Sequence, residues 1–322
     1  MSAAADRRAV AALIAGACVI GVGPILVRLA DAGPAAAGFW RMAFAVPLLL
    51  VMPRPAADAS GGTPPTVMLA GLFFAADLAC WHYGIRLTSV ANATVLPNLT
   101  PILVAGAAWA LFGQKPSPGF VAAMLLAVGG AVIMALARNG GATLGVDGRN
   151  PHLGDALSAL TSVWYASYFL CVQHARRSAS ARRVMLVSTA VAAPLLLAVA
   201  LALREPVLPG AAVGWAACAG LGVMHVAGQG AVAWAMGRLP AALSAVVMLV
   251  QPVVAGLLGW LAFGEALSPL QGLGAGVALA GVAFAQVAFT RNAATGQDGS
   301  RNGNGRRPFG RRPSIPDEGD AA

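Results

Sequence analysis

The chain has 322 residues, of which 58% are hydrophobic and only 10% are charged, and its net charge is +9. Soluble domains carry about 25% charged residues, so this composition excludes an ordinary soluble protein and indicates one that lies in a lipid bilayer. The positive charge does not indicate nucleic-acid binding, because the Arg residues lie between apolar runs and in the tail rather than on one face.

Ten apolar runs are long enough for helices that cross a bilayer, which takes about 20 residues each. The predicted spans are 9–29, 35–52, 66–86, 91–112, 119–137, 154–173, 184–203, 211–236, 241–263 and 270–290. Arg7 and Arg8 precede the first run, as in a signal peptide, but the run is long, lacks a clean cleavage site and is followed by nine more. The expected fold class is therefore an all-α integral membrane protein with ten transmembrane helices.

A set of spaced residues occurs twice in the chain, at an offset of 151 positions. The first copy contains Pro101, Trp109, Phe112, Gly113, Ser117, Pro118, Ala127 and Gly130; the second contains Pro252, Trp260, Phe263, Gly264, Ser268, Pro269, Ala278 and Gly281. Apolar runs match easily by chance, whereas spaced Pro, Trp, Phe-Gly and Ser-Pro do not. We therefore predict a duplicated unit of about 150 residues.

The duplication divides the chain into five predicted segments. They are a cytoplasmic N-terminus at 1–8, a first repeat at 9–137, a periplasmic loop at 138–153, a second repeat at 154–290 and a disordered tail at 291–322. The tail is rich in Gly, Asn, Arg and Pro. Its arginines could meet anionic lipid headgroups, although a solvated tail without a specific role is the simpler interpretation.

The distribution of Lys and Arg in the loops predicts the orientation, because cytoplasmic loops are enriched in these residues. Inside segments would hold Arg7, Arg8, Arg54, Lys115, Arg176, Arg177, Arg182, Arg183, Arg238 and the six tail arginines; outside segments would hold Arg28, Arg86, Arg138, Arg149 and Arg204. Both termini are then cytoplasmic. Five spans per repeat is an odd number, so the repeats would enter the membrane in opposite directions, with Lys115 inside and its repeat mate Ala266 outside. Many secondary transporters share this plan and bind substrate between the repeats.

Several motifs, together with the duplication, resemble the EamA family of the drug/metabolite transporter (DMT) superfamily over residues 8–291. They are Phe39-Trp40-Arg41, the stretch from Thr88-Ser89-Val90-Ala91-Asn92 through Asn98-Leu99-Thr100-Pro101 to Gly113-Gln114, and Leu153-Gly154-Asp155. The resemblance implies two inverted five-helix EamA repeats, secondary active transport and a bacterial inner (cell) membrane location. One departure is Gln114, where the family pattern has Glu; only the second copy keeps the carboxylate, as Glu265.

Ionisable residues inside apolar spans are costly and usually face a cavity or a partner. Asp77 lies near the middle of the third span, and repeat alignment pairs it with Gln229, so we expect both to face a central cavity. Asp77 is the predicted coupling group, able to carry a proton or to hold a cationic group. The alternative is a fixed ion pair with Arg41 between helices.

Two further ionisable residues are candidates for the same site. Arg41 could bind a substrate carboxylate through two parallel hydrogen bonds, or it could extend to the outer headgroups or hold the fold. His225 shares a helix face with Gln229 and could relay protons, or it could be a neutral histidine that is hydrogen-bonded across helices. His82 lies on another side of its helix from Asp77, and no neighbouring residues give it metal-site spacing.

Aromatic, amide and proline residues complete the predicted site. Trp81, Trp164 and Tyr168 could line a cavity for an apolar or cationic ligand, although helix packing explains them as well. Asn98 and Gln251 are amides within spans that could hydrogen-bond to substrate or to a neighbouring helix. Helix breaks are expected at Pro24, Pro97, Pro101 and Pro252, so spans one, four and nine should bend.

The sequence shows no enzyme signature and no nucleotide-binding loop. We expect no catalytic residues, no metal and no cofactor. The predicted function is secondary transport, by alternating access, of an amino acid or related amphipathic compound, with coupling to protons through Asp77 and with export favoured by the family resemblance. A non-transporting receptor or scaffold, an intramembrane enzyme and a channel are the alternatives. The predicted partners are a small-molecule substrate and the lipid bilayer, and a homodimer is left open.

Overall fold

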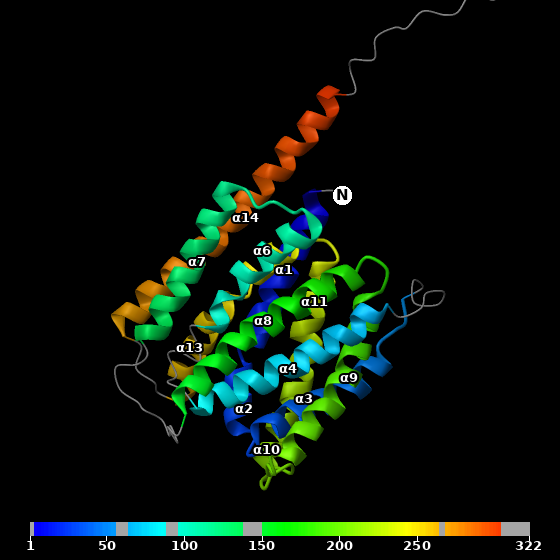
Figure 1. Ribbon diagram of the computed structural model, residues 1–322, viewed down its shortest axis with the longest axis vertical. Coiled ribbons are helices and arrows are strands. Elements are labelled where there is room, and N and C mark those ends of the chain that lie inside the picture. Colours follow the sequence, from blue (N-terminus) through cyan, green and yellow to red (C-terminus); the bar gives the residue numbers. More distant parts are fainter. Residues whose placement is uncertain (1–2, 56–63, 88–95, 138–149, 264–267, 304–322) are drawn as a thin grey trace, which may run out of the picture.

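The computed structural model describes residues 3–55, 64–87, 96–137, 150–263 and 268–303, and every regular element within these ranges is helical (Figure 1). The first half contains α1 (Ala3–Ile20), α2 (Gly23–Leu29), α3 (Pro34–Val51), α4 (Pro65–Leu87), η2 (Pro97–Leu99), α6 (Thr100–Phe112) and α7 (Pro118–Ala137). The second half contains α8 (Pro151–Ala175), α9 (Ala181–Ala202), α10 (Ala212–Met224), η3 (His225–Gln229), α11 (Gly230–Met236), α12 (Ala241–Val247), α13 (Val250–Phe263) and α14 (Pro269–Gly303).

Helical segments occur at all ten predicted spans, but only eight of them are long and apolar enough to cross a membrane within the described residues. The fourth span is a shorter apolar helix over Pro97–Phe112, and residues 91–95 lie outside the described part of the chain. The sixth, α8, has 25 residues but is less apolar, since it carries the buried Ser158, Thr161 and Ser162.

The last helix extends beyond the membrane span. The apolar span Pro269–Phe289 agrees with the predicted 270–290, but the helix α14 continues to Gly303, where we expected a disordered tail. No proline interrupts the chain before Pro308, so the backbone can keep its helical hydrogen bonds beyond the apolar stretch. The rest of the tail lies outside the described residues, as do most of the predicted 138–153 loop, the Thr88–Asn92 motif and the turn with Gly264, Glu265 and Ala266.

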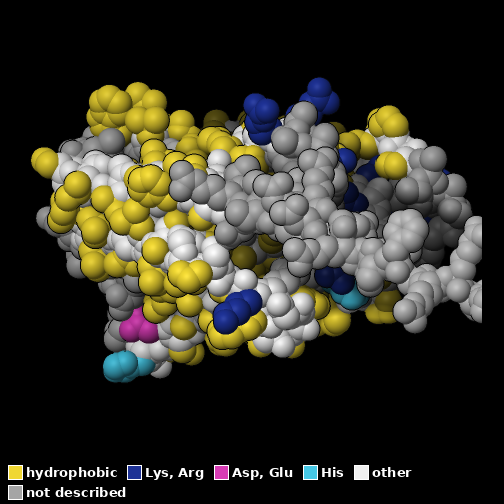
Figure 2. All heavy atoms as spheres, turned by 90° about the horizontal axis from the view of Figure 1, so that it is seen from above, with side chains coloured by type: hydrophobic (Ala, Val, Ile, Leu, Met, Phe, Trp, Pro, Cys, Tyr) yellow, Lys and Arg dark blue, Asp and Glu magenta, His cyan; other side chains and the backbone are white. Residues whose placement is uncertain are grey.

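Large apolar side chains are exposed on the outside of the helix bundle. Val51 is 86% exposed and Leu111 is 69% exposed, and Figure 2 shows hydrophobic side chains over much of one face with few charged side chains among them. Soluble monomers rarely expose apolar patches of more than a few hundred Å². Such a surface is suited to contact with the hydrocarbon of a lipid bilayer.

The packing of the helices follows the sequence repeat. Two helix pairs, α3 with α9 and α7 with α14, join the equivalent helices of the two repeats. Two other contacts between the repeats occur twice. The contact of α4 with α8 is repeated by that of α11 with α1, and the contact of α4 with α9 is repeated by that of α10 with α3. The two repeats are therefore related by an approximate two-fold axis, and α7 and α14 run in opposite directions (Figure 1). Opposite directions are what an odd number of spans per repeat requires.

Small residues bring α7 and α14 into backbone contact. A methyl group on Gly130 would overlap the backbone of Ala278, and one on Gly281 would overlap the backbone of Ala127. In the sequence repeat, Ala127 is equivalent to Ala278 and Gly130 to Gly281, so the contact is reciprocal. Such small-residue contacts are typical of helix pairs in membranes.

We expect Gly130→Ala to destabilise the protein by about 1–3 kcal/mol, because the added methyl group must push two backbones apart. Gly129→Ala is the matched control: it gains the same helix propensity, but its methyl group would meet no atom within 4 Å. Thermal unfolding of the purified variants measures the difference. Equal unfolding temperatures for the two variants would contradict the close contact.

Three spans are interrupted at or beside the predicted prolines. The first span divides between α1 and α2, where Pro24 occupies the first turn of α2. The fourth begins with the 3-10 helix η2 at Pro97, followed by Pro101 at the start of α6. The ninth divides into α12 and α13, and Pro252 lies in the first turn of α13. Proline is tolerated in a first turn because no intrahelical partner exists there for its missing N–H.

Candidate functional site

Five of the predicted site residues are buried in the interior of the bundle, between the two repeats. Arg41 comes from α3, Asp77 from α4, Tyr168 from α8, and His225 and Gln229 from η3. Their exposed fractions are between 1% and 9%. None of these five side chains faces the lipid, although all carry polar or charged groups. A substrate site at the interface of inverted repeats lies in this position.

Phe74 of α4 lies at the centre of this group and was not among the predicted residues. Its ring centroid is 4.8 Å from that of Tyr168 and 5.5 Å from that of His225, and the Cζ atom of Arg41 lies 5.4 Å above the ring. A guanidinium over an aromatic face is a cation–π contact. One phenyl ring therefore links side chains from α3, α4, α8 and η3.

The segment that carries His225 and Gln229 is a π-helix of five residues within the eighth span. Such π segments in α-helices contain an extra residue and occur frequently at functional sites. The Nε2 atom of His225 lies 2.9 Å from Oγ1 of Thr189 on α9. His225 thus makes the cross-helix hydrogen bond considered from sequence, while its Nδ1 atom remains without a partner.

Several buried polar atoms in this region make no hydrogen bond within the described structure. They are Nε and Nη2 of Arg41, both ring nitrogens of His82, Nδ1 of His225 and Oε1 of Gln229. The charges of Arg41 and Asp77 interact, but the two bare nitrogens show that Arg41 does not form a two-point pair with this carboxylate. Buried groups without partners cost about 1–3 kcal/mol each. The fold therefore retains unused hydrogen-bonding capacity where the repeats meet.

The remaining predicted residues lie at various distances from this cluster. Gln251 belongs to it, because Tyr165 interacts with the side chains of both Gln229 and Gln251. Trp164 instead stacks on Phe73, with ring centroids 5.8 Å apart. Trp81 packs against His82 at 5.0 Å. Asn98 lies in η2, and η2 contacts α7 and α8.

Sequence reasoning missed Phe74 and Thr189, and it named Tyr165 only as one of the aromatic residues of the sixth span. Phe74 precedes Asp77 by three positions, so helix periodicity could have placed it on the same face. Tyr165 precedes Tyr168 by three positions, and the two rings stack at 6.0 Å. A single Thr in an apolar span gives no comparable signal, so Thr189 could only be identified from the packing of α9 against the site.

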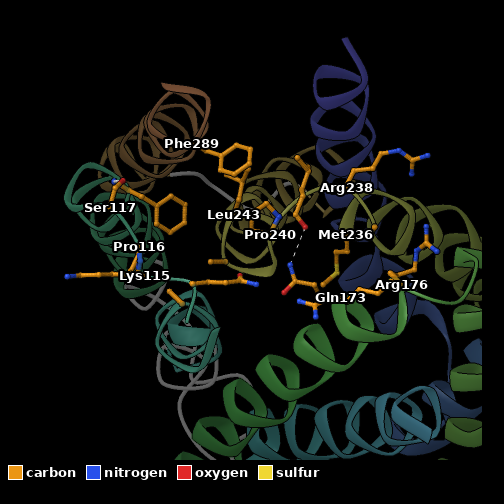
Figure 3. A pocket seen from close by; sticks show the side chains of 17 residues that line it. Lys115, Pro116, Ser117, Gln173, Arg176, Met236, Arg238, Pro240, Leu243 and Phe289 are labelled. Carbon is orange, nitrogen blue, oxygen red and sulfur yellow. Dashed lines mark hydrogen bonds between the residues drawn. The ribbon is translucent and has the colours of Figure 1, made fainter. Parts of the chain in front are cut away.

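A cavity of about 530 Å³ lies at one end of the bundle. Figure 3 shows Lys115, Ser117 and Phe289 on one side of it and Gln173 and Met236 on the other. Its lining includes cationic residues from three different loops, namely Lys115, Arg176, Arg177 and Arg238. All four belong to loops predicted to lie inside, so those loops meet at the same end of the molecule. The buried cluster around Phe74 does not line this cavity.

At the opposite end, hydrogen bonds join the loop after α9 to the start of α3. The carboxylate of Glu205 accepts hydrogen bonds from the backbone N–H of Ala36, at 3.0 Å, and from the hydroxyl of Tyr83. Two further bonds join the same segments, from the backbone N–H of Gly33 to the Pro206 carbonyl and from the Trp40 indole to the Val207 carbonyl. A side chain at position 33 would overlap Glu205, so glycine permits this close approach. The cavity and these hydrogen bonds therefore lie at opposite ends of the helix bundle.

We expect Glu205→Ala to open this second end, because two hydrogen bonds to a charged acceptor are lost. A charged hydrogen bond contributes about 1.5–3 kcal/mol, so amide hydrogen exchange in 31–40 and 203–210 should accelerate by at least about tenfold. Glu205→Gln keeps an acceptor for the Ala36 N–H and should show a smaller effect. Unchanged exchange in both variants would mean that Glu205 does not hold this end closed.

The fold and the buried cluster define a polytopic helical membrane protein built from two inverted repeats, with a polar site between them. The sequence model of the EamA-like transporter family matches residues 7–136 and 152–286. The chain therefore belongs to the EamA family, as its motifs predicted, and is a multi-pass membrane transporter of the DMT type.

A solved structure described only as "Crystal structure of protein" superposes with a TM-score of 0.70 over 88% of this chain and 98% of its own, at 21% sequence identity. At that identity the similarity shows the fold alone. Comparison with the curated proteins gave no match.

Proposed function

We propose that this protein is a secondary active transporter of a small amphipathic metabolite, such as an amino acid or a related compound, and that it works by alternating access. The observation that carries the proposal is the group of unpartnered polar atoms from both repeats, buried where the repeats meet. A transported solute that is held there would meet these atoms with its own polar groups. A scaffold has no need of such groups, and membership of the EamA-like transporter family favours transport over a receptor or an intramembrane enzyme.

The two ends of the bundle support the same proposal. One end contains the cavity near Lys115, and at the other Glu205 holds the loop after α9 against α3 and α4. Alternating access requires that one end is open while the other is sealed. With the loops around the cavity on the cytoplasmic side, as the distribution of Arg and Lys predicts, this conformation opens inwards. A bacterial inner membrane and cytoplasmic termini are part of the proposal.

Proton coupling through Asp77 and net export complete the proposal. Asp77 is a carboxylate in the bundle interior whose charge interacts with that of Arg41, so gain or loss of a proton there would change the electrostatics of the whole cluster. Intramembrane carboxylates commonly serve as proton relays. Export rests on the family resemblance.

Flux measurements in proteoliposomes test the proposal. Radiolabelled amino acids and related metabolites would be screened with and without an imposed pH gradient, and protein-free liposomes would give the background. We expect saturable flux of at least one compound and a change of net direction when the gradient is reversed. Steady ion currents would favour a channel instead, and the lack of flux for the whole panel would contradict transport of this solute class.

A further inference from the structure

The guanidinium of Arg41 has one edge without hydrogen-bond partners, and this edge indicates which chemical group binds in the central site. The Nε and Nη2 atoms have no partner and are buried from solvent, although the residue carries a full positive charge. These two nitrogens lie on the same edge of the planar guanidinium, and their N–H bonds point in nearly parallel directions. That edge matches the two oxygens of a carboxylate or a phosphate group.

The surroundings of Arg41 leave this edge available. The guanidinium lies over the ring of Phe74, with the Cζ atom 5.4 Å from the ring centroid, whereas the two edge nitrogens are buried but make no hydrogen bond. Asp77 does not satisfy the two edge nitrogens. The single positive charge of Arg41 balances the charge of a carboxylate but only about half of that of a phosphate group, so a carboxylate fits better than a phosphate.

The rings beside Arg41 suit the rest of such a solute. Tyr165 and Tyr168 stack on each other with ring centroids 6.0 Å apart, and Tyr168 also packs on Phe74, the ring beneath Arg41. Aromatic walls with a few placed polar groups are typical of small-molecule sites. The apolar body of the solute would lie against these rings while its acid group contacts Arg41.

We infer that the Nε–Nη2 edge of Arg41 binds the carboxylate of the transported solute, which makes Arg41 the residue that selects acids over their neutral analogues. The inference rests on the proposed function for the nature of the site. Because both nitrogens are buried, the solute reaches them only after the repeats move apart at one end.

Equilibrium binding of two probes of the same shape tests this inference. The purified chain, in nanodiscs of phosphatidylcholine, would be titrated with 4-methylpentanoate and with 4-methylpentanamide in a calorimeter. The acid should bind about 10- to 100-fold more tightly than the amide, which corresponds to one two-point charged contact. Zwitterionic lipid excludes competition by anionic headgroups.

Variants connect that preference to Arg41. Arg41→Gln should abolish the preference for the acid, and Arg41→Lys should reduce it, because lysine keeps the charge but lacks the planar fork. Arg54→Gln removes an exposed arginine at the end of α3 and should change neither affinity. Thermal unfolding shows whether each variant is folded, and Arg41→Lys provides the comparison if Arg41→Gln does not fold.

Three results would overturn the inference: no preference for the acid in the wild-type chain, including no binding; an undiminished preference in Arg41→Gln; or tighter binding of isobutyl phosphate than of the carboxylate. Flux is measured separately in proteoliposomes. Flux without an acid preference would refute carboxylate binding by Arg41 but would be consistent with the proposed transport. An Arg41-dependent preference without flux would refute transport but would be consistent with a carboxylate-binding site.

Discussion

Replacement of Asp77 by Asn should abolish accumulation of solute against its gradient while leaving the protein folded. Asn has nearly the same shape but cannot exchange a proton, so a pH gradient could no longer be converted into a solute gradient. With one proton moved per solute, a difference of about one pH unit supports about tenfold accumulation, since each unit is worth 1.36 kcal/mol. Proteoliposomes with an imposed gradient measure that ratio, and for Asp77→Asn we expect a ratio of one.

Exchange of labelled for unlabelled solute provides the control, because exchange needs no net proton movement. Asp77→Asn should still exchange solute if its only defect is in coupling. The titratable groups near enough to interact electrostatically with Asp77 are Arg41 from α3, Cys80 from α4, and Tyr165 and Tyr168 from α8, so Tyr165→Phe should be tested for an independent effect on the pH profile. Wild-type accumulation and an unchanged pH dependence in Asp77→Asn would remove the residue from the mechanism.

Deletion of Ala227 should nearly eliminate transport without unfolding the chain. The π segment contains one residue more than an α-helix would, so the loss of one residue converts it to α-helix and leaves the packed faces of α10 and α11 in register. The regular α-helix would change the spacing of the side chains within the segment, so His225 and Gln229 would shift from their present positions beside Thr189 and the cluster. A misplacement of about 1 Å at a binding site can cost 100-fold in rate, and we expect a loss of at least this size in flux.

The substitution Ala227→Leu is the control for that deletion. Ala227 is exposed on the outside of the bundle, so a larger apolar side chain there should leave flux unchanged. The unfolding temperature of the deletion variant should equal or exceed that of the wild type, because regular helical hydrogen bonds replace the π segment. Normal flux in the deletion variant would show that the π segment has no role in the site.

The sequence predicts the helices of this protein well because their signals are local. Apolar runs and the paired Pro, Trp and Ser-Pro positions mark ten helical segments, and the cost of burying charge in lipid singles out Asp77 and Arg41. The helix α14 continues past the end of the last membrane span, because loss of hydrophobicity at residue 290 does not itself end a helix. Neither the apolar runs nor the positions of proline mark the π segment, which carries no proline and packs against α1.

The site was harder to predict because it depends on which helices meet. Phe74 and Tyr165 are ordinary apolar-face residues in sequence, and only the contact of α4 with α8 makes them neighbours of Arg41. Thr189 carries no chemistry of its own and matters through His225. The roles of the predicted residues in binding and coupling stay predictions until the variants are measured.

The reciprocal contact of Gly130 with Ala278 and of Gly281 with Ala127 has a consequence for biosynthesis. The helix α7 leaves the ribosome about 130 residues before its partner α14 begins, and its glycine face must wait beside lipid or the insertion machinery during that interval. An N-terminal half released early would keep this face uncovered. Quality control in the membrane should therefore recognise truncated chains by α7, and complete assembly depends on the synthesis of α14.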